Sequence, residues 1–583
     1  MSVFYIGKLT SLNNEFTQVF SNEKYIFAHT ELNGKNFVQQ ESNQFKFCSD
    51  YMLVQNAQNK KIKGEWSQFE SHDNLLNQLE NETLSLWLTF GKNDFEISLA
   101  SVKLSRARWY YITCASGVFF SSDMRQLLPY SQKKINRQVA FSILKFGETP
   151  EGETVISDIY SVPVSSKLCF NSSELTFFNM EAPIQNTHFQ QYYKIPYSFS
   201  GGNISNTKTT LQDVLGPMEG SNTHLLISGG IDSTLLNCLF DEISLTSYPA
   251  HYISFSQNDK EIPFAQEAIK ETKAELHFHE MNGSDLIKSF HSACTKMIYP
   301  TIDASSAFVG AFLSSKIEGP DILIDGTGAD SCYGTRDYSV PLFQGVDKGS
   351  LTLKLAEYAA TFNDFFNPKS NKSFLPRDQY IKDQNFQEVL WYLGAYANLG
   401  LKNSKPYTET LIPKLQELYR LIPSEHSGDS WAKYTVVKLA LYACRQTSVK
   451  FYDMFPDSTI ELPFLHRSML TDQGKYSWSE KSINGIPKYP LKKILEDYKS
   501  KDFIYRKKVG LNNPIYHWFQ NKEIKNYFVS IVEKGEFINM LTPLGRFLWR
   551  NNVKKDIVDP KIIYLTLSLA SFEEWSKFNK VSL

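Results

Sequence analysis

The sequence has few of the features that would cross-link the protein or anchor it in a membrane. Its seven cysteines are scattered and form no CxxC pair, so we expect free thiols in a reducing compartment. The first eight residues lack the long apolar core of a signal peptide. The longest apolar stretches, such as residues 562–567, are too short to span a bilayer. These absences predict a cytoplasmic protein that does not bind membranes.

The sequence also lacks an excess of charge of either sign. Its 61 basic and 62 acidic residues leave a formal net charge of -1, so no basic field favours nucleic acid as a partner. A hydrophobic content of 42% and a charged content of 21% are typical of globular proteins. A chain of 583 residues is too long for one ordinary domain. We therefore expect two or more globular domains without a preference for nucleic acid.

The distribution of apolar segments predicts two domains, over residues 1–195 and 205–583. The first contains short β-type segments, and residues 198–206 are rich in Gly, Ser and Asn, as in a linker. The second alternates strands with helices and becomes mainly helical from about residue 350. Such alternation predicts a parallel sheet covered by helices, with ligands at the carboxyl ends of its strands. The predicted elements are strands at 84–90, 109–114, 117–121, 247–255, 275–279 and 321–325, and a helix at 262–272.

The hexapeptide SGGIDS, residues 228–233, joins a short apolar strand to an apolar helix. Glycines let the backbone approach an anion, and free amides at a helix N-terminus point toward it. Serine hydroxyls add further donors. No Gly-Lys-Ser/Thr follows, so this is not a Walker loop. The alternative to a phosphate site is a plain Gly-Gly turn.

A second glycine-rich loop follows the predicted strand at 321–325. It spans residues 326–334 and contains Asp330. Because ATP carries several negative charges, a nearby aspartate is tolerated mainly when a cation lies between them. The pair of loops therefore predicts a magnesium pyrophosphate site, although Asp330 alone could equally be a turn aspartate.

Two histidines, His277 and His279, alternate on the predicted strand at 275–279 and so share one face. No third ligand follows at metal spacing. We expect them to be structural or surface residues.

The order of these motifs resembles the asparagine synthetase family. SGGIDS resembles the pyrophosphate loop of the N-type ATP pyrophosphatases, and the family continues with a GxG[AS]DE loop that this chain matches except at Ser331. Residues 463–465 resemble the PFL motif of the family. Residues 506–511 resemble its R-x-K-x-G-F segment, which puts Lys508 on the catalytic lysine; the alternative is a surface lysine beside Lys507. The resemblance spans essentially the whole chain and is strongest over 222–340 and 450–520.

The resemblance implies a fold in two parts. It implies a degenerate Ntn-type α+β domain, like the class II glutamine amidotransferases, followed by an α/β parallel-sheet ATP pyrophosphatase domain (adenine nucleotide alpha-hydrolase-like) with a helical C-terminal part. It also implies ATP and Mg²⁺ as cofactors, with ATP cleaved to AMP and pyrophosphate while a carboxylate is adenylated. The implied Mg²⁺ ligands are Asp232 and Asp330, and the implied catalytic residues are Lys508 and Thr327. The implied ATP contacts are Ile227, Ser228, Gly229, Gly230, Asp232, Ser233, Phe255, Ser256, Asp325 and Gly326.

Several positions depart from the family pattern. A glutaminase of this type needs a cysteine at position 2, where this chain has Ser2, so we expect a scaffold domain without glutaminase activity. Thr327 stands where asparagine synthetases have Glu and β-lactam-forming relatives have Tyr, and Thr is no base without help. Glu461 and His466 replace an Arg and an Asp of the family, so an ordinary aspartate pocket is not expected. Lasso-peptide cyclases, which also lack the N-terminal cysteine, share the PFLH tetrapeptide.

Three functions are compatible with these residues. The first is an amide or lactam synthetase of specialised metabolism that joins a small-molecule or peptide carboxylate to an amine. The second is an asparagine synthetase that uses ammonia or a Ser-dependent glutaminase. The third is a catalytically silent binding partner. The identity of the substrates and the oligomeric state, including a homodimer, stay open.

Overall fold

A computed structural model of the chain forms two compact units. One comprises Met1–Ala140, Thr149–Lys194 and Asn579–Leu583, and the other Phe141–Glu148 and Ile195–Phe578. The structure describes residues 3–8, 17–21, 25–29, 37–41, 44–48, 76, 84–90, 94–101, 108–114, 117–146, 149–150, 152–174, 188–191, 193–255, 259–300, 304–334, 417–427, 432, 435–436, 439, 453–484, 486–506, 515–558 and 560–583.

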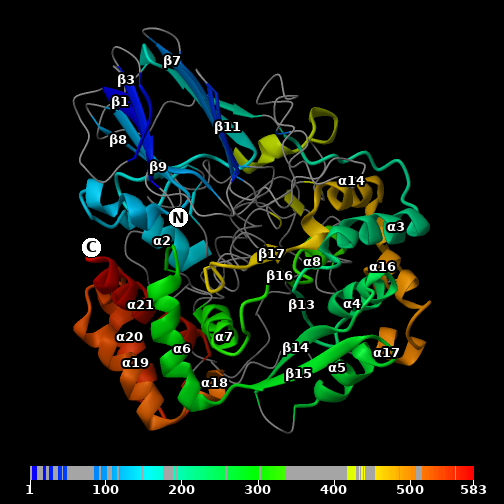
Figure 1. Ribbon diagram of the computed structural model, residues 1–583. Coiled ribbons are helices and arrows are strands. Elements are labelled where there is room, and N and C mark those ends of the chain that lie inside the picture. The colour runs from blue at the N-terminus through cyan, green and yellow to red at the C-terminus, as the bar shows by residue number, and fades with distance from the viewer. Residues whose placement is uncertain are drawn as a thin grey trace. The chain divides into compact units, whose positions relative to one another are not determined.

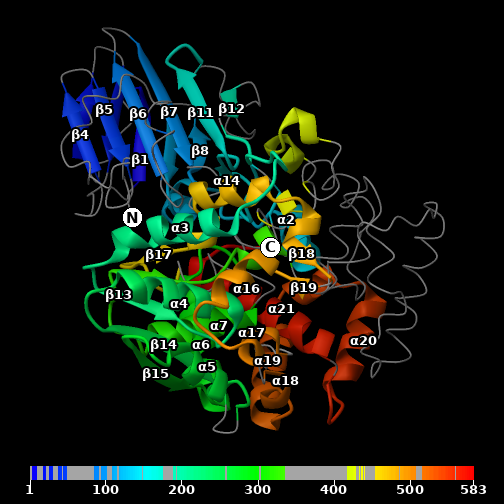
Figure 2. The same cartoon turned by 90° about the vertical axis from the view of Figure 1, so that its right-hand side faces the viewer.

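The first unit contains two antiparallel six-stranded sheets. One has the order β10-β8-β9-β1-β3-β2. The other has the order β12-β11-β7-β6-β5-β4 (Figure 2). The strands of the first sheet are β1 (Val3–Lys8), β2 (Thr17–Ser21), β3 (Tyr25–His29), β8 (Tyr110–Cys114), β9 (Gly117–Ser121) and β10 (Tyr160–Ser161). Those of the second are β4 (Phe37–Glu41), β5 (Gln44–Cys48), β6 (Leu84–Phe90), β7 (Phe95–Ser101), β11 (Ser166–Asn171) and β12 (Phe189–Gln191). A 3-10 helix, η3 (Met124–Tyr130), and α2 (Arg137–Phe146) follow the strand β9.

Side chains from both sheets form the core of this unit. Phe4 stacks on Phe120 and meets the edge of Trp109, with ring centroids 5.5 Å apart in both pairs. The Trp109 indole N–H donates to the carbonyl of Ser85 over 3.0 Å, which ties one sheet to the other. The strands predicted at 84–90, 109–114 and 117–121 are present as β6, β8 and β9. The assignment to the Ntn class rests on the resemblance and stays a prediction.

The second unit is built on a five-stranded parallel sheet, which confirms the α/β prediction. Its order is β15-β14-β13-β16-β17 (Figure 1). The strands are β13 (Thr223–Leu226), β14 (Tyr248–Ser254), β15 (Ala274–Glu280), β16 (Ile322–Ile324) and β17 (Thr459–Glu461). The chain moves outward from β13 to β15 and then returns to β16 on the other side of β13. The strand order therefore reverses between β13 and β16, and ligands of such sheets bind at that point, beyond the carboxyl ends of the strands.

Helices connect and cover the strands of this sheet. α3 and α16 pack on α4, and α6 packs on α7. The described helices are α3 (Ile204–Leu215), α4 (Ile231–Ile243), α5 (Ile262–Ile269), α6 (Gly283–Lys296), α7 (Ala304–Ser314), α8 (Ala329–Tyr333), α14 (Arg467–Lys475), α15 (Trp478–Lys481), α16 (Tyr489–Leu495), α17 (Lys501–Tyr505), α18 (Ile515–Trp518), α19 (Lys522–Lys534), α20 (Pro543–Val553) and α21 (Pro560–Asn579). Short 3-10 helices are η6 (Gly216–Met218), η9 (Glu417–Leu421), η10 (Ser424–His426), η13 (Pro463–Leu465) and η14 (Phe537–Met540), and β18 (Ser482–Ile483) pairs with β19 (Ile486–Pro487). None of the described helices is long and apolar enough to cross a membrane.

Two boundaries differ from the prediction for local reasons. The stretch predicted as a linker over 198–206 already enters α3 at Ile204, because the Asn203 side chain accepts from the amide of Asn206 and caps the helix. The helix predicted over 262–272 ends at Ile269, since Glu271 adopts a left-handed backbone with φ 64°. Most of the segment predicted as helical over 350–450 lies outside the described residues.

Three histidines from neighbouring strands form one hydrogen-bonded chain. The Asn222 amide donates to the carbonyl of Gly319, so its oxygen accepts from Nε2 of His224 over 3.0 Å. Nδ1 of His224 must then accept from Nε2 of His251 (2.8 Å), and Nδ1 of His251 from Nε2 of His279 (2.9 Å). Each imidazole in this chain is neutral. His279 is structural and His277 is exposed, as expected.

The histidine chain predicts loss of stability in acid. Burial, together with the neighbouring histidines, lowers the pKa of His251 to about 3. The unfolded chain, with an ordinary histidine pKa near 6.5, therefore binds a proton that the folded chain does not. The contribution of His251 to the free energy of unfolding should be greatest above about pH 6.5. At pH 5 the free energy of unfolding should be lower by about 2 kcal/mol. Urea unfolding at the two pH values measures this.

The variant His251→Met should lose most of this pH dependence. The exposed His517→Gln should keep it. Equal acid sensitivity of His251→Met and the native protein would contradict the assignment.

Candidate functional site

The glycine-rich loop between β13 and α4 has a shape that only glycine allows at its centre. Gly229 has φ +66°, and a Cβ there would lie 2.8 Å from backbone atoms at the start of α5. The Ser228 and Ser233 hydroxyls lie 3.1 Å apart, and the Ser228 hydroxyl also accepts from the amide of Gly230 over 3.3 Å. Gly230 caps α4, which places the free amides of the first helical turn beside these hydroxyls. The loop therefore gathers donors at a helix N-terminus, as an anion site requires.

The loop after β16 packs directly against this first turn. A Cβ on Gly326 would lie 3.2 Å from the Cβ of Asp232 and 3.4 Å from the amide of Ser233. Gly328 has φ +103° and leads into the short helix α8, whose first turn contains Asp330. The absence of a side chain at Gly326 thus lets the two loops pack closely. The tertiary structure brings together the motifs at 228–233 and 326–334.

The two predicted metal ligands contact the same cation, the ammonium of Lys488. Nζ of Lys488 lies 2.6 Å from Oδ2 of Asp232 and 2.6 Å from Oδ1 of Asp330. Burial opposes the charge of this lysine, but the two carboxylates outweigh burial and raise its pKa. Lys488 is the N-cap residue of α16 and has a left-handed backbone, φ 56°. The sequence analysis did not identify Lys488. The only signal for it was the expectation that two neighbouring carboxylates need a positive charge, and that expectation does not say which residue supplies the charge.

The arrangement fits a magnesium ion bound together with phosphate. Oδ1 of Asp232 is buried and has no hydrogen-bond partner among the described residues, so a carboxylate oxygen is available to a ligand. The described residues hold no group of three His, Cys, Asp or Glu side chains around one point. Mg²⁺ is usually bound through one or two carboxylates together with substrate phosphates and water. Asp232 and Asp330 match that donor set.

Thr327 and Asp325 form a closed pair in the second loop. The amide and the hydroxyl of Thr327 both donate to Oδ1 of Asp325, over 2.7 and 2.8 Å. The Asp325 amide donates in turn to the carbonyl of Glu461 on β17 over 2.9 Å. In this position the Thr327 hydroxyl is a hydrogen-bond donor to a carboxylate. The catalytic role expected of Thr327 stays a prediction.

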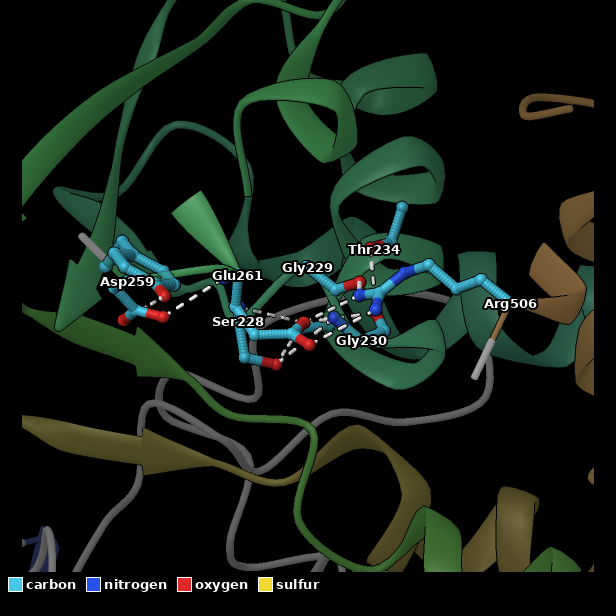
Figure 3. Close-up of polar contacts among 9 residues, drawn as sticks. Ser228, Gly229, Gly230, Thr234, Asp259, Glu261 and Arg506 are labelled. Atoms are coloured by element: carbon cyan, nitrogen blue, oxygen red, sulfur yellow. Dashed lines mark hydrogen bonds and ion pairs between the residues drawn. The ribbon is translucent and has the colours of Figure 1, made fainter. Parts of the chain in front are cut away.

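A half-buried arginine, Arg506, contacts the first loop. Nη2 of Arg506 donates to Oε2 of Glu261 (2.7 Å) and to the carbonyl of Gly229 (3.1 Å), while Nη1 donates to Oε1 of Glu261 (3.2 Å). The guanidinium also lies 3.5 Å from the ring centroid of Phe264. Figure 3 shows Arg506 reaching across to Glu261 and the glycines. Sequence analysis placed Arg506 in a motif but assigned it no contact.

The remaining predicted residues are only partly described. Ile227 is buried at the end of β13, where its amide donates to the carbonyl of His251. Phe255 follows β14 and meets the edge of Trp518, with ring centroids 5.9 Å apart. Ser256, Lys508 and Ser2 lie outside the described residues.

Comparisons with known proteins agree on one family. The sequence model described as asparagine synthase matches residues 221–575. A search of characterised proteins finds the "Asparagine synthetase [glutamine-hydrolyzing] 1" of Bacillus subtilis (strain 168), 22% identical over 470 residues, which cover 77% of this chain and 70% of that protein. The match of the family model includes both glycine-rich loops, Lys488 and Arg506.

The Arg506–Glu261 contact predicts a large stability effect. Replacing the arginine in Arg506→Met removes the guanidinium from a buried carboxylate, because Glu261 is only 6% exposed. The free energy of unfolding should fall by about 3–5 kcal/mol, as for other broken buried pairs. Urea unfolding followed by circular dichroism measures the change.

The double variant Arg506→Met, Glu261→Met should recover most of that loss. The more exposed pair Lys493–Glu496, 2.8 Å apart, supplies the control, and Lys493→Met should change stability by less than about 1 kcal/mol. If the free energy of unfolding of Arg506→Met were no lower than that of Lys493→Met, the Arg506–Glu261 contact would not stabilise the fold as proposed.

Proposed function

The chain belongs to the asparagine synthase family, whose members are ATP-dependent ligases that form carbon–nitrogen bonds, and we propose that it adenylates a carboxylate and transfers the acyl group to an amine. ATP would be cleaved to AMP and pyrophosphate. The observation that carries this proposal is the convergence of Asp232 and Asp330 on one cation. They come from two different loops that meet where the strand order of the sheet reverses.

The anion-binding part of the proposed site is the first turn of α4. Its amides and the hydroxyls of Ser228 and Ser233 would bind the pyrophosphate part of ATP. Asp232 and Asp330 would hold Mg²⁺, which would supply positive charge to the phosphates of ATP. Lys488, held by the same carboxylates, adds a positive charge on the protein side of this cluster.

Arg506 supports a catalytic role for Lys508. Arg506 contacts the carbonyl of Gly229, and Lys508 follows it by two residues. The catalytic role of Lys508 is inferred from the motif at 506–511 that these two residues share. A lysine there would stabilise negative charge on the α-phosphate and on the tetrahedral intermediate.

The acceptor amine would not be deprotonated by Thr327. The Thr327 hydroxyl donates to Asp325, so the amine must reach the adenylate as a free base or lose its proton to another group. This feature, together with Ser2 and Glu461 at positions where the family pattern differs, supports an amide or lactam synthetase of specialised metabolism without glutaminase activity. Cys114, Cys169, Cys238, Cys294 and Cys332 are reduced thiols, which fits a reducing compartment such as the cytoplasm.

The named relative supports a second candidate. A match to a glutamine-hydrolysing asparagine synthetase over 70% of its length is equally consistent with synthesis of asparagine from aspartate. In that case the nitrogen would come from ammonia or from an unusual Ser2-dependent glutaminase.

Product analysis tests the proposal. Purified protein with Mg²⁺, ATP and panels of carboxylates and amines should release AMP and pyrophosphate, with no ADP. Glutamine alone should yield no glutamate above a protein-free blank. Formation of ADP and phosphate would contradict the proposed reaction, and asparagine formed from aspartate would favour the second candidate. Glutaminase activity abolished in Ser2→Ala would overturn the scaffold assignment of the N-terminal domain.

Asp330 and Lys508 should affect different steps. Asp330→Asn should weaken binding of magnesium ATP by at least about tenfold, since even outer-shell partners of a metal contribute about 10–100-fold. Lys508→Ala should leave ATP affinity nearly intact and lower turnover by about 10²–10³, as expected when one charge-stabilising donor is lost. Calorimetry and pyrophosphate release separate the two effects.

Two matched variants control for general disruption. Asp321→Asn changes an exposed aspartate immediately before β16, and Lys507→Ala changes the lysine beside Lys508; both should behave like the native enzyme. Normal turnover of Lys508→Ala would remove Lys508 from the active site.

A further inference from the structure

A second lysine of the synthetase-like unit, Lys481, is buried in a polar network. Lys481 has no exposed surface, and its Nζ donates to Oε1 of the fully buried Gln473 over 2.7 Å. The same Nζ lies 5.9 Å from the ring centroid of Tyr333. The network continues through Asp472, whose Oδ2 accepts from the hydroxyls of Thr207 (2.6 Å) and Tyr333 (3.4 Å). A charged amine and a carboxylate are therefore enclosed together in the interior.

This network is joined to both partners of the Lys488–Asp330 ion pair. Tyr333 is the last residue of α8, and Asp330 lies in the first turn of that five-residue helix. Lys481 immediately precedes β18, which pairs with β19 from Ser482 to Pro487. Lys481 is thus covalently joined to one strand of a hairpin whose other strand ends immediately before Lys488. The amide of Lys488 also donates to the carbonyl of Tyr333 over 3.3 Å, so one short path runs from Lys481 to each member of the ion pair.

The charges in this network depend on one another. Burial raises the pKa of Asp472, while Thr207, Lys475, Tyr333 and Lys481 act against that rise. Burial lowers the pKa of Lys481 to about 7, although Cys332, Asp472 and Glu480 oppose the loss of its proton.

The groups packed around Lys481 come from several elements. They are Cys332 and Tyr333 of α8, Asp472 and Gln473 of α14, and Glu480 of α15. When Lys481 loses its proton, the buried Asp472 loses a counter-charge, and its hydrogen bond from Tyr333 at the end of α8 is put at risk.

We propose that Lys481 is a positioning residue, whose ammonium holds α8 and the β18–β19 hairpin so that Asp330 and Lys488 stay in register for magnesium ATP. This inference rests on the proposed function, because it concerns the same nucleotide site. Lys481 itself lies outside the set of groups that contact the phosphate loop. Its effect on the nucleotide passes through Tyr333 on one side and the hairpin on the other.

The proposal predicts opposite pH trends for binding and for stability. Between about pH 7 and 10.5 the unfolded chain keeps a lysine proton that the folded chain loses, so the contribution of Lys481 to the free energy of unfolding rises with pH. The affinity for magnesium ATP should fall over the same interval, because the ammonium that positions the site disappears. A purely structural lysine would not weaken binding while stability rises.

Calorimetric titration of the full-length protein with ATP and Mg²⁺ at pH 6.5 and 8.5 tests this. The Kd of the native protein should rise about 5-fold or more at pH 8.5, a coupling of ordinary size. Lys481→Arg stays charged at both pH values and should keep the tight Kd at both. Lys481→Met should show the weak Kd at both, and the exposed Lys522→Met should follow the native profile.

The outcomes separate this inference from the proposed function. A native protein that binds no magnesium ATP at either pH would overturn the proposed function and this inference with it. Binding with the same Kd at both pH values would overturn the positioning role alone, and that result needs no variant to fold. A Lys481→Arg protein whose Kd still rises with pH would also overturn it, since the titrating group would then lie elsewhere.

Discussion

The contact of one ammonium with two carboxylates is the interaction on which the site depends. Asp232 and Asp330 come from loops nearly a hundred residues apart in the chain, and both lie 2.6 Å from Nζ of Lys488. Two carboxylates this close would repel each other without a cation between them. Lys488 thus keeps the two loops together in the absence of ligand, and it leaves one buried oxygen of Asp232 without a hydrogen-bond partner among the described residues.

The surrounding structure serves to hold this cluster in place. Arg506 and Glu261 fix the glycine loop from one side through the carbonyl of Gly229. The network of Lys481 and Asp472 supports α8 and the hairpin from the other. Both supports contain buried charged groups, Glu261 in one and Lys481 in the other, and such contacts are costly to break.

The parallel sheet and the two glycine-rich loops were predictable, because the spacing of apolar residues and short local motifs encode them. Alternating apolar strands and helices after residue 222 led to the parallel sheet, and the motifs at 228–233 and 326–334 led to an anion site at the carboxyl ends of its strands. Gly229 could be anticipated because its left-handed backbone and its contact with α5 exclude a side chain. Helix ends were less accessible: Asn203 capped α3 inside a stretch that reads as a linker.

Pairings between distant segments were not predictable. The sequence alone determined that a phosphate-type loop and a carboxylate loop exist, since each is encoded by adjacent residues. Only the tertiary structure decided that Lys488 bridges them, that Arg506 meets Glu261, and that His224, His251 and His279 form one chain. These contacts join residues that are separated by between 27 and 256 positions. Strand order and burial decide which of these residues meet, because they bring particular charged groups within contact distance. A local sequence pattern carries no information about either.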